Sequence, residues 1–189
     1  MRPRRHRRLL PGRDGGARLT AIYIDADACP VREEVYRVAA RLAVPVFVVS
    51  NFSRPIRPPG LPNVKLVMAG DGFDAADDWI AGHIGAGDLC VTADIPLAGR
   101  VLAAGARAVA PNGHVWTAAN IGGALAGREL SRHLRELGLD GRGPSAFTKA
   151  DRSRFLGALD GEVRRALRDA PGEPPLAPAV PARGTGGNG

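Results

Sequence analysis

The clearest hydrophobic pattern near the start of the chain is a short apolar run that leads into two carboxylates. Residues 22–24 (Ile-Tyr-Ile) favour a β-strand, and Asp25 and Asp27 follow, one residue apart. Pro30 then introduces apolar residues at helical spacing: Val31, Val35, Val38, Ala39 and Leu42. The segment predicts a strand, an acidic turn and a helix. If the strand is parallel and buried, its carboxyl end opens into the crevice where α/β proteins bind ligands.

Strand patterns continue to alternate with helical patterns along the chain. The continuous apolar run at residues 44–49 ends at Ser50 and Asn51, and its lack of polar alternation indicates a strand covered on both faces. Further strands are expected at residues 63–68, 89–92 and 108–110, and helices at 73–80, 96–104, 117–126, 128–137 and 149–167. This alternation implies βαβ units, so we expect a three-layer α/β/α fold with a mainly parallel central sheet.

The basic charge of the chain is concentrated in its first residues. The formal net charge is +7, but residues 1–18 hold seven arginines and one aspartate, which leaves 19 basic and 18 acidic residues in the rest. We expect one domain at 19–168, an Arg-rich leader at 1–18 and a disordered Pro/Gly-rich tail at 169–189. The leader is either a basic arm that contacts nucleic-acid phosphates or simply a disordered, solvated segment.

The cysteine content and the apolar runs bear on where the protein works. Cys29 and Cys90 are the two cysteines of the chain, and no CxxC or Cys/His cluster accompanies them, so neither a disulfide scaffold nor a structural zinc site is supported. The leader lacks an apolar run long enough for a signal sequence or a membrane span. We therefore expect a cytoplasmic protein that does not associate with membranes; the sequence leaves its oligomeric state open.

Acidic residues follow three of the predicted strands. Asp25 and Asp27 follow the first, Asp94 follows the fourth, and four acids follow the third: Asp71, Asp74, Asp77 and Asp78. In a parallel sheet these ends meet at one edge, and carboxylates at close range need a counter-charge such as a hard divalent cation. Mg²⁺ or Mn²⁺ held there activates water and offsets charge on a phosphoryl group, so the pattern predicts phosphodiester hydrolysis.

Each of these acids, taken singly, also has a structural explanation. Asp27 and Asp94 both precede a proline segment that could open a helix, and Asp is a preferred N-cap residue. An acid in the first helical turn, such as Asp74, suits the helix dipole. Capping does not require Asp25 and Asp27 together, however, and the convergence of several acids favours a metal site.

Other polar residues are candidates for contacting substrate. Ser50, Asn51 and Thr92 end predicted strands, where they could bind phosphate or water or merely complete the backbone hydrogen bonding. Arg100 and Arg152 could contact phosphate, although such arginines more often form exposed salt bridges.

Four separated motifs resemble those of the YaiI/YqxD family of uncharacterised bacterial proteins. They are the segments at 23–31, at 72–77 (Gly-Phe-Asp-x-Ala-Asp), at 87–98 with Thr92-Ala93-Asp94, and at 143–152. The resemblance implies a PIN-like fold, a group in which many members are Mg²⁺- or Mn²⁺-dependent ribonucleases. It assigns metal ligation and catalysis to Asp25 and Asp94, with Asp74 or Asp77 as the helix-borne acid. Nuclease PIN domains often carry another acid just after Thr-x-Asp; residues 95–98 have none, and Asp27 is the candidate replacement.

Two other functions compete with a nuclease acting on single-stranded RNA. A phosphatase of the haloacid dehalogenase type would use Asp25 as nucleophile and Asp27 as general acid. That fold needs a helix that presents a lysine between the segments of Ser50 and Asp71. Here only a Pro-rich loop and one strand fit between them, and Lys65 falls inside the strand. A catalytically silent RNA-binding or interaction module would use the leader and the Pro/Arg loop, which the near-neutral body disfavours. The residues expected to act are thus Asp25, Asp27 and Asp94, supported by Asp74 and Asp77.

Overall fold

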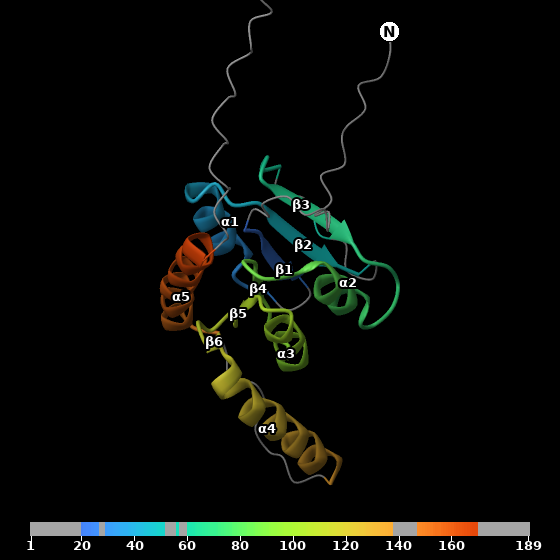
Figure 1. Ribbon diagram of the computed structural model, residues 1–189. Coiled ribbons are helices and arrows are strands. Elements are labelled where there is room, and N and C mark those ends of the chain that lie inside the picture. Colours follow the sequence, from blue (N-terminus) through green and yellow to red (C-terminus); the bar gives the residue numbers. More distant parts are fainter. Residues whose placement is uncertain (1–19, 27–28, 52–55, 57–59, 138–146, 170–189) are drawn as a thin grey trace, which may run out of the picture.

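Six strands form a single sheet in the computed structural model (Figure 1). The structure describes residues 20–26, 29–51, 56, 60–137 and 147–169. The strands are β1 (Ile22–Asp25), β2 (Val46–Ser50), β3 (Val64–Met68), β4 (Leu89–Val91), β5 (Arg107–Val109) and β6 (Val115–Trp116). The helices are α1 (Arg32–Arg41), α2 (Ala75–His83), α3 (Ile95–Ala103), α4 (Ala118–Glu136) and α5 (Lys149–Asp169). The predicted leader lies outside the described residues, as does the predicted tail except for Asp169, which ends α5.

The strand order is β3-β2-β1-β4-β5-β6, so β1 lies inside the sheet between two strands from distant parts of the chain. Strands β1 to β5 pair in parallel, and β6 pairs antiparallel with β5. The predicted α/β class with a mainly parallel sheet is therefore confirmed. Strand β6 was not predicted because its two residues are too short to show an alternating pattern.

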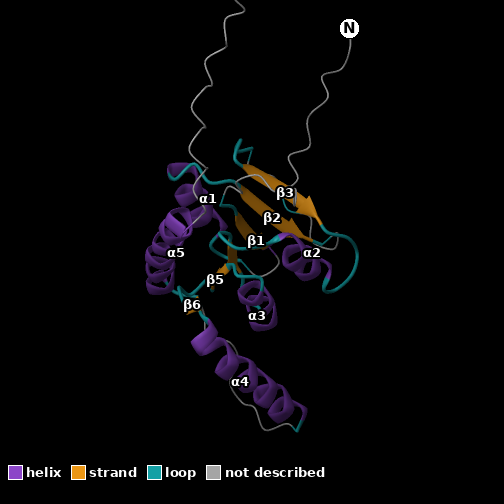
Figure 2. Ribbon diagram, in the orientation of Figure 1, coloured by secondary structure: helices purple, strands orange, loops and turns teal. Residues whose placement is uncertain are grey.

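Helices cover both faces of the sheet (Figure 2). In β1, Ile22 and Ile24 pack in a buried cluster with residues of α1 and α5, whereas Tyr23 packs in a second cluster with residues of α2 and α3. Side chains alternate between faces along a strand, so Asp25 continues the Tyr23 side and belongs to the α2–α3 face. The two-sided core thus directs a carboxylate toward the helices that carry the other candidate acids.

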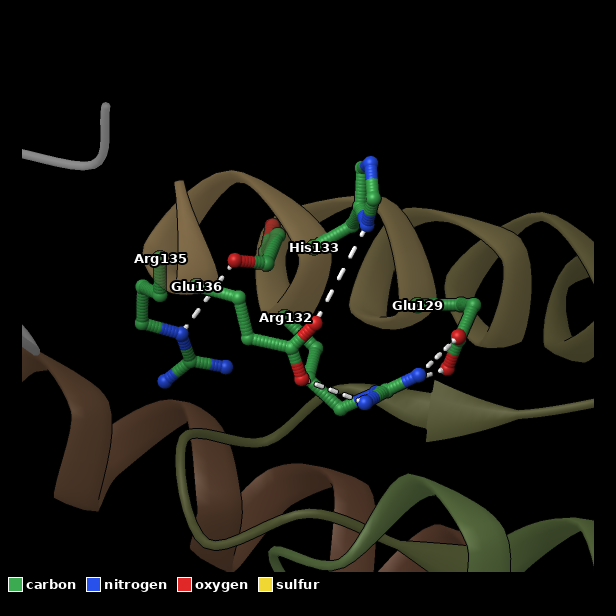
Figure 3. Close-up of polar contacts among 6 residues, drawn as sticks. Glu129, Arg132, His133, Arg135 and Glu136 are labelled. Carbon is green, nitrogen blue, oxygen red and sulfur yellow. Dashed lines mark hydrogen bonds and ion pairs between the residues drawn. The ribbon is translucent and has the colours of Figure 1, made fainter. Parts of the chain in front are cut away.

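Helix α4 is one continuous helix that extends away from the sheet (Figure 1), where the sequence predicted two helices separated at Gly127. A single glycine costs a helix only about 1 kcal/mol, and Thr117 and Asn120 form a capping box at the start. Arg132 pairs with Glu129 and Glu136 along the helix (Figure 3). No residue of α4 is buried. None of the helices in the described part of the chain is long and apolar enough to cross a membrane.

Helix α5 begins as the sequence indicates and packs by a slightly different stripe. The Thr148 backbone N–H donates to Asp151 Oδ2 (2.8 Å) and the Asp151 N–H donates to Thr148 Oγ1 (3.1 Å), which is the reciprocal pattern of a capping box. The spacing of Phe155, Leu159, Val163 and Leu167 predicts an apolar stripe on this helix. The first three are buried, but Ala166 is buried in place of Leu167, which is exposed.

Candidate functional site

Asp25 and Thr92 form a buried hydrogen bond at the carboxyl ends of neighbouring parallel strands. Asp25 ends β1 and is 6% exposed, and Thr92 follows β4 and is fully buried. The Thr92 Oγ1 hydroxyl donates to Asp25 Oδ2 at 2.8 Å. This bond fixes the orientation of a carboxylate that has almost no contact with solvent. It lies at the edge of the sheet where open α/β proteins bind ligands.

Asp94 extends this arrangement to the start of α3. Its backbone N–H donates to Thr92 Oγ1 (2.9 Å), so one hydroxyl contacts both acidic residues. Asp94 Oδ1 caps α3 by accepting from the Leu97 N–H at 2.8 Å, which confirms the capping explanation for this residue. Asp94 Oδ2 accepts from Arg128 Nη1 of α4 at 3.1 Å. Capping and a charged environment therefore coexist at Asp94.

Asp77 adds a third carboxyl group from the first turn of α2. The pKa of Asp77 is raised from 3.8 to about 6, and burial of the carboxyl group is the largest cause. The negative charges of Asp25, Asp94 and Asp74 contribute to the same rise, and the Arg100 guanidinium opposes it. Asp74 occupies the N-cap position of α2, but its side chain makes no capping hydrogen bond. Carboxyl groups from separate elements thus act on one another electrostatically, as the sequence predicted.

The raised pKa of Asp77 predicts a specific pH dependence of stability. Between about pH 4 and pH 6 the folded protein holds the Asp77 proton more tightly than the unfolded chain, so this group favours folding at low pH. That contribution is lost as the pH rises through the folded-state value near 6. Asp77→Asn imitates the neutral group, so its melting temperature relative to wild type should rise between about pH 4 and pH 6 and level off at higher pH. A difference in melting temperature that stays constant over this range would contradict the prediction.

A comparison of sequences places the chain in a family. A family profile described as "Uncharacterized BCR, YaiI/YqxD family" matches residues 23–165. The chain belongs to the YaiI/YqxD family. A UPF0178 protein of Caulobacter vibrioides is 54% identical over 153 residues, which cover 81% of this chain and 99% of the relative. A UPF0178 protein of Rhodopseudomonas palustris is 54% identical over 150 residues, or 79% and 94% of the two chains. No solved structure gives a significant match.

Besides Thr92, three more of the predicted substrate-contacting residues of this YaiI/YqxD protein lie near these acids: Ser50 and Asn51 at the end of β2, beside β1, and Arg100 on α3. Ser50 is buried and its hydroxyl donates to the Asn51 carbonyl oxygen at 3.2 Å. Asn51 Oδ1 is buried and has no hydrogen-bond partner in the described structure. Arg100 of α3 is half exposed and pairs with Asp78 of α2 at 2.8 Å. An unpaired buried carbonyl oxygen is costly unless a ligand, ion or water meets it.

Arg152, the other predicted phosphate contact, lies on the opposite face of the sheet. It pairs with Glu34 of α1, a carboxylate with no exposed surface, and its guanidinium lies 5.7 Å from the centre of the Phe147 ring. Arg37 also donates to Glu34 Oε1, at 3.1 Å. Arg152 therefore neutralises a buried charge and joins α5 to α1. That role accounts for it without a substrate.

Asp27, which the sequence assigned to catalysis and metal binding, lies outside the described residues. Within the described part of the YaiI/YqxD chain, no group of three or more His, Cys, Asp or Glu side chains is arranged to hold a metal ion. Asp25, Asp77 and Asp94 are electrostatically coupled but do not form a closed ligand set there. Metal binding therefore remains a prediction.

Arg128 and Glu34 are two charged residues of the YaiI/YqxD chain whose contacts sequence reasoning did not anticipate. Arg128 reaches Asp94 across 34 positions of sequence, from a helix in which no residue is buried. Glu34 follows Glu33 on α1 and resembles any solvated acid in sequence, yet it is fully buried. A clue was available for Glu34: it lies three residues after Val31 and one before Val35, on the apolar side of α1.

Proposed function

We propose that this YaiI/YqxD protein is a divalent-cation-dependent phosphodiesterase that acts on RNA. The observation that carries the proposal is the pair of hydrogen bonds by which Thr92 joins Asp25 to Asp94, beside an Asp77 carboxyl whose pKa is raised by burial and by both acids. A stable fold gains nothing from holding like charges near one another. Such an arrangement is typical of sites that receive a cation.

The donor atoms present suit Mg²⁺ or Mn²⁺, which prefer carboxylate and carbonyl oxygen. Asp25, Asp77 and Asp94 would hold the cation, and Asp27 and Asp74 are the further candidates. Asn51 supports this assignment: Val49, two residues earlier, is the register partner of Asp25 and packs on the α2–α3 face, so alternation places Asn51 on the same side. Its buried Oδ1 has no hydrogen-bond partner among the residues that the structure describes. Mg²⁺ keeps several water ligands and needs only one or two carboxylates, so a closed three-residue set is not required.

The residues of the chain would divide the remaining work. A bound divalent cation supplies an activated water and offsets charge on the phosphoryl group. Thr92 holds Asp25 in one orientation through its hydroxyl. Arg128 and Arg100 are each about half exposed and pair with single carboxylates, so they can turn toward a phosphate oxygen. No covalent intermediate is required, because the nucleophile is water.

Calorimetric titration with Mn²⁺ provides the direct test of the cation site. We expect one site in the wild-type protein, and at least about tenfold weaker binding in Asp77→Asn, because the variant removes an anionic ligand. Asp160→Asn is the matched control. Asp160 pairs with Arg41 and Arg164 on the α1–α5 side of the sheet, so the variant should bind Mn²⁺ with the affinity of wild type. Equal affinities in wild type and Asp77→Asn would contradict the assigned site.

Cleavage of a labelled single-stranded RNA, with Mg²⁺ or Mn²⁺ and with the cation removed by chelation, tests the reaction itself. We expect cleavage that disappears with the cation and returns when it is added back. Release of phosphate from an aryl phosphate through Asp25 would instead support the phosphatase. No observation favours that alternative, because Lys65 lies within β3, paired in register with Phe47, and not on a helix facing Asp25. RNA that stays intact with either cation would overturn the proposal.

A further inference from the structure

Phe73 is the most exposed of the large apolar side chains in the described part of the chain, with 96% of its surface in contact with solvent. The next most exposed is Leu130 of α4, at 59%. A phenylalanine ring gains much from burial, so a ring held almost wholly in water points to a binding role.

The ring stands at the edge of the candidate site. The segment from residue 69 to 74 leaves the carboxyl end of β3 and enters α2, so Phe73 directly precedes Asp74 and lies one helical turn before Asp77. The Ala69 N–H donates to the Ser50 carbonyl oxygen at 2.9 Å, which holds the start of this segment against the end of β2. Phe73 therefore lies next to the acids at the start of α2 and not in a distant loop.

Both ends of the segment are anchored, so the exposure of Phe73 does not come from a frayed strand or helix. Gly70 has a φ of +119°, a conformation that turns the chain sharply out of β3. The Ala75 N–H donates to the Gly72 carbonyl oxygen at 3.1 Å, which closes the turn into α2. The buried side chains of Ala76 and Ile80 then hold α2 on the sheet. The backbone on either side thus presents the ring outward.

The charges around Phe73 select the occupant. Asp71, Asp74 and Asp78 carry negative charge on the same exposed segment, so an apolar protein surface or a lipid tail would leave carboxylates facing a dry interface. An unpaired nucleobase is flat and uncharged at its face, stacks on an aromatic ring, and remains partly hydrated at its edges. A bound cation and Arg100, half exposed at the other side of Asp78, can accommodate the attached phosphates.

We propose that Phe73 is a stacking residue for an unpaired base of a single-stranded RNA whose neighbouring phosphate lies at the carboxylate site. This inference rests on the proposed function and names its substrate class: the bases of a duplex are already stacked on each other and cannot cover the ring. The surrounding carboxylates repel phosphates, so binding of the strand requires a divalent cation.

The test measures binding separately from cleavage. A short single-stranded RNA containing 2-aminopurine is titrated with the full-length protein in Ca²⁺ and in Mn²⁺, and both anisotropy and base fluorescence are recorded. Wild type should bind the strand and quench the base, whereas Phe73→Ala should bind about tenfold or more weakly and lose the quenching. Phe73→Trp should retain both properties. Leu167→Ala, which removes an exposed apolar side chain from α5 on the other face, should match wild type.

The outcomes separate this inference from the proposed function. The Phe73 side chain is almost fully exposed in the folded protein, so the melting temperature of Phe73→Ala should equal that of wild type. A loss of binding in this variant would then not result from unfolding. If the strand binds through Phe73 but is not cleaved, the stacking role of Phe73 is supported and the proposed hydrolase activity is contradicted. If wild type cleaves the strand and Phe73→Ala binds it with unchanged affinity, the stacking role is contradicted and the proposed hydrolase activity stands. No binding of the strand with either cation, or equal binding of the duplex, overturns the inference.

Discussion

Asp25→Asn is expected to lower cation-dependent RNA cleavage by at least about a hundredfold, which is the largest functional effect predicted for any single substitution here. Asp25 is buried, accepts a hydrogen bond from Thr92, and ends β1, an inner strand of the sheet. Asparagine keeps the size and one acceptor oxygen, so the fold should survive while the charge is lost. Initial cleavage rates at saturating Mn²⁺ measure the change, with circular dichroism as the check on folding.

The same variant has a second readout that does not depend on activity. Asp25 raises the pKa of Asp77, so removing its charge should shift the Asp77 titration below the value of about 6 that wild type is expected to show. Carboxyl chemical shifts followed by NMR report this directly. Asp160→Asn serves again as the control, with cleavage and the Asp77 titration both as in wild type. Cleavage that persists in Asp25→Asn at the wild-type rate would rule out the assigned centre.

Gly113→Ala is expected to destabilise the protein by at least about 2–3 kcal/mol, the largest loss of stability that a single methyl group should cause in this fold. Gly113 has a φ of +87°, which side chains rarely adopt. A Cβ atom there would lie 2.6 Å from the Arg154 carbonyl carbon and 2.7 Å from the Phe155 nitrogen. Both are backbone atoms of α5, and the fully buried Phe155 ring prevents the helix from moving away.

Gly157→Ala provides a matched control on α5, the helix against which Gly113 packs. Nothing lies within 4 Å of a Cβ atom at Gly157, and the residue is exposed within α5. Alanine there should stabilise the protein by about 0.5–1 kcal/mol, because it favours the helical backbone. Chemical denaturation of both variants measures the two effects. A Gly113→Ala protein as stable as wild type would mean that the hairpin between β5 and β6 does not pack against α5 as described.

The α/β class and the parallel sheet could be predicted because buried strands and amphipathic helices have distinct periods. Residues 44–49 show the continuous apolar run of a strand covered on both faces, and β2 is buried throughout. Features that depend on packing were missed. Gly127 looked like a helix end, but the ion pairs of Arg132 and the capping box at Thr117 carry α4 through it.

The candidate site was predictable to the extent that parallel strands bring their carboxyl ends together. That rule brought Asp25 and Thr92 into hydrogen-bond contact and placed Asp94 beside them. The rule could not predict that Arg128 contacts Asp94, because the sequence does not show in which direction α4 leaves the sheet. It also could not show that Arg152 lies on the far face, since a salt bridge to a buried Glu34 depends on how α5 packs against α1.

The place of β1 in the sheet also constrains when the domain can form during translation. Of the six strands β1 is made first; β2 pairs along one of its sides, with β3 beyond β2, and its other side pairs with β4, which starts at Leu89. A ribosome-bound chain that stops before Leu89 leaves the inner edge of β1 open, with backbone groups that can join a strand of another molecule. We therefore expect chaperones that cover such strand edges to protect this chain from aggregation most while β4 is still inside the exit tunnel.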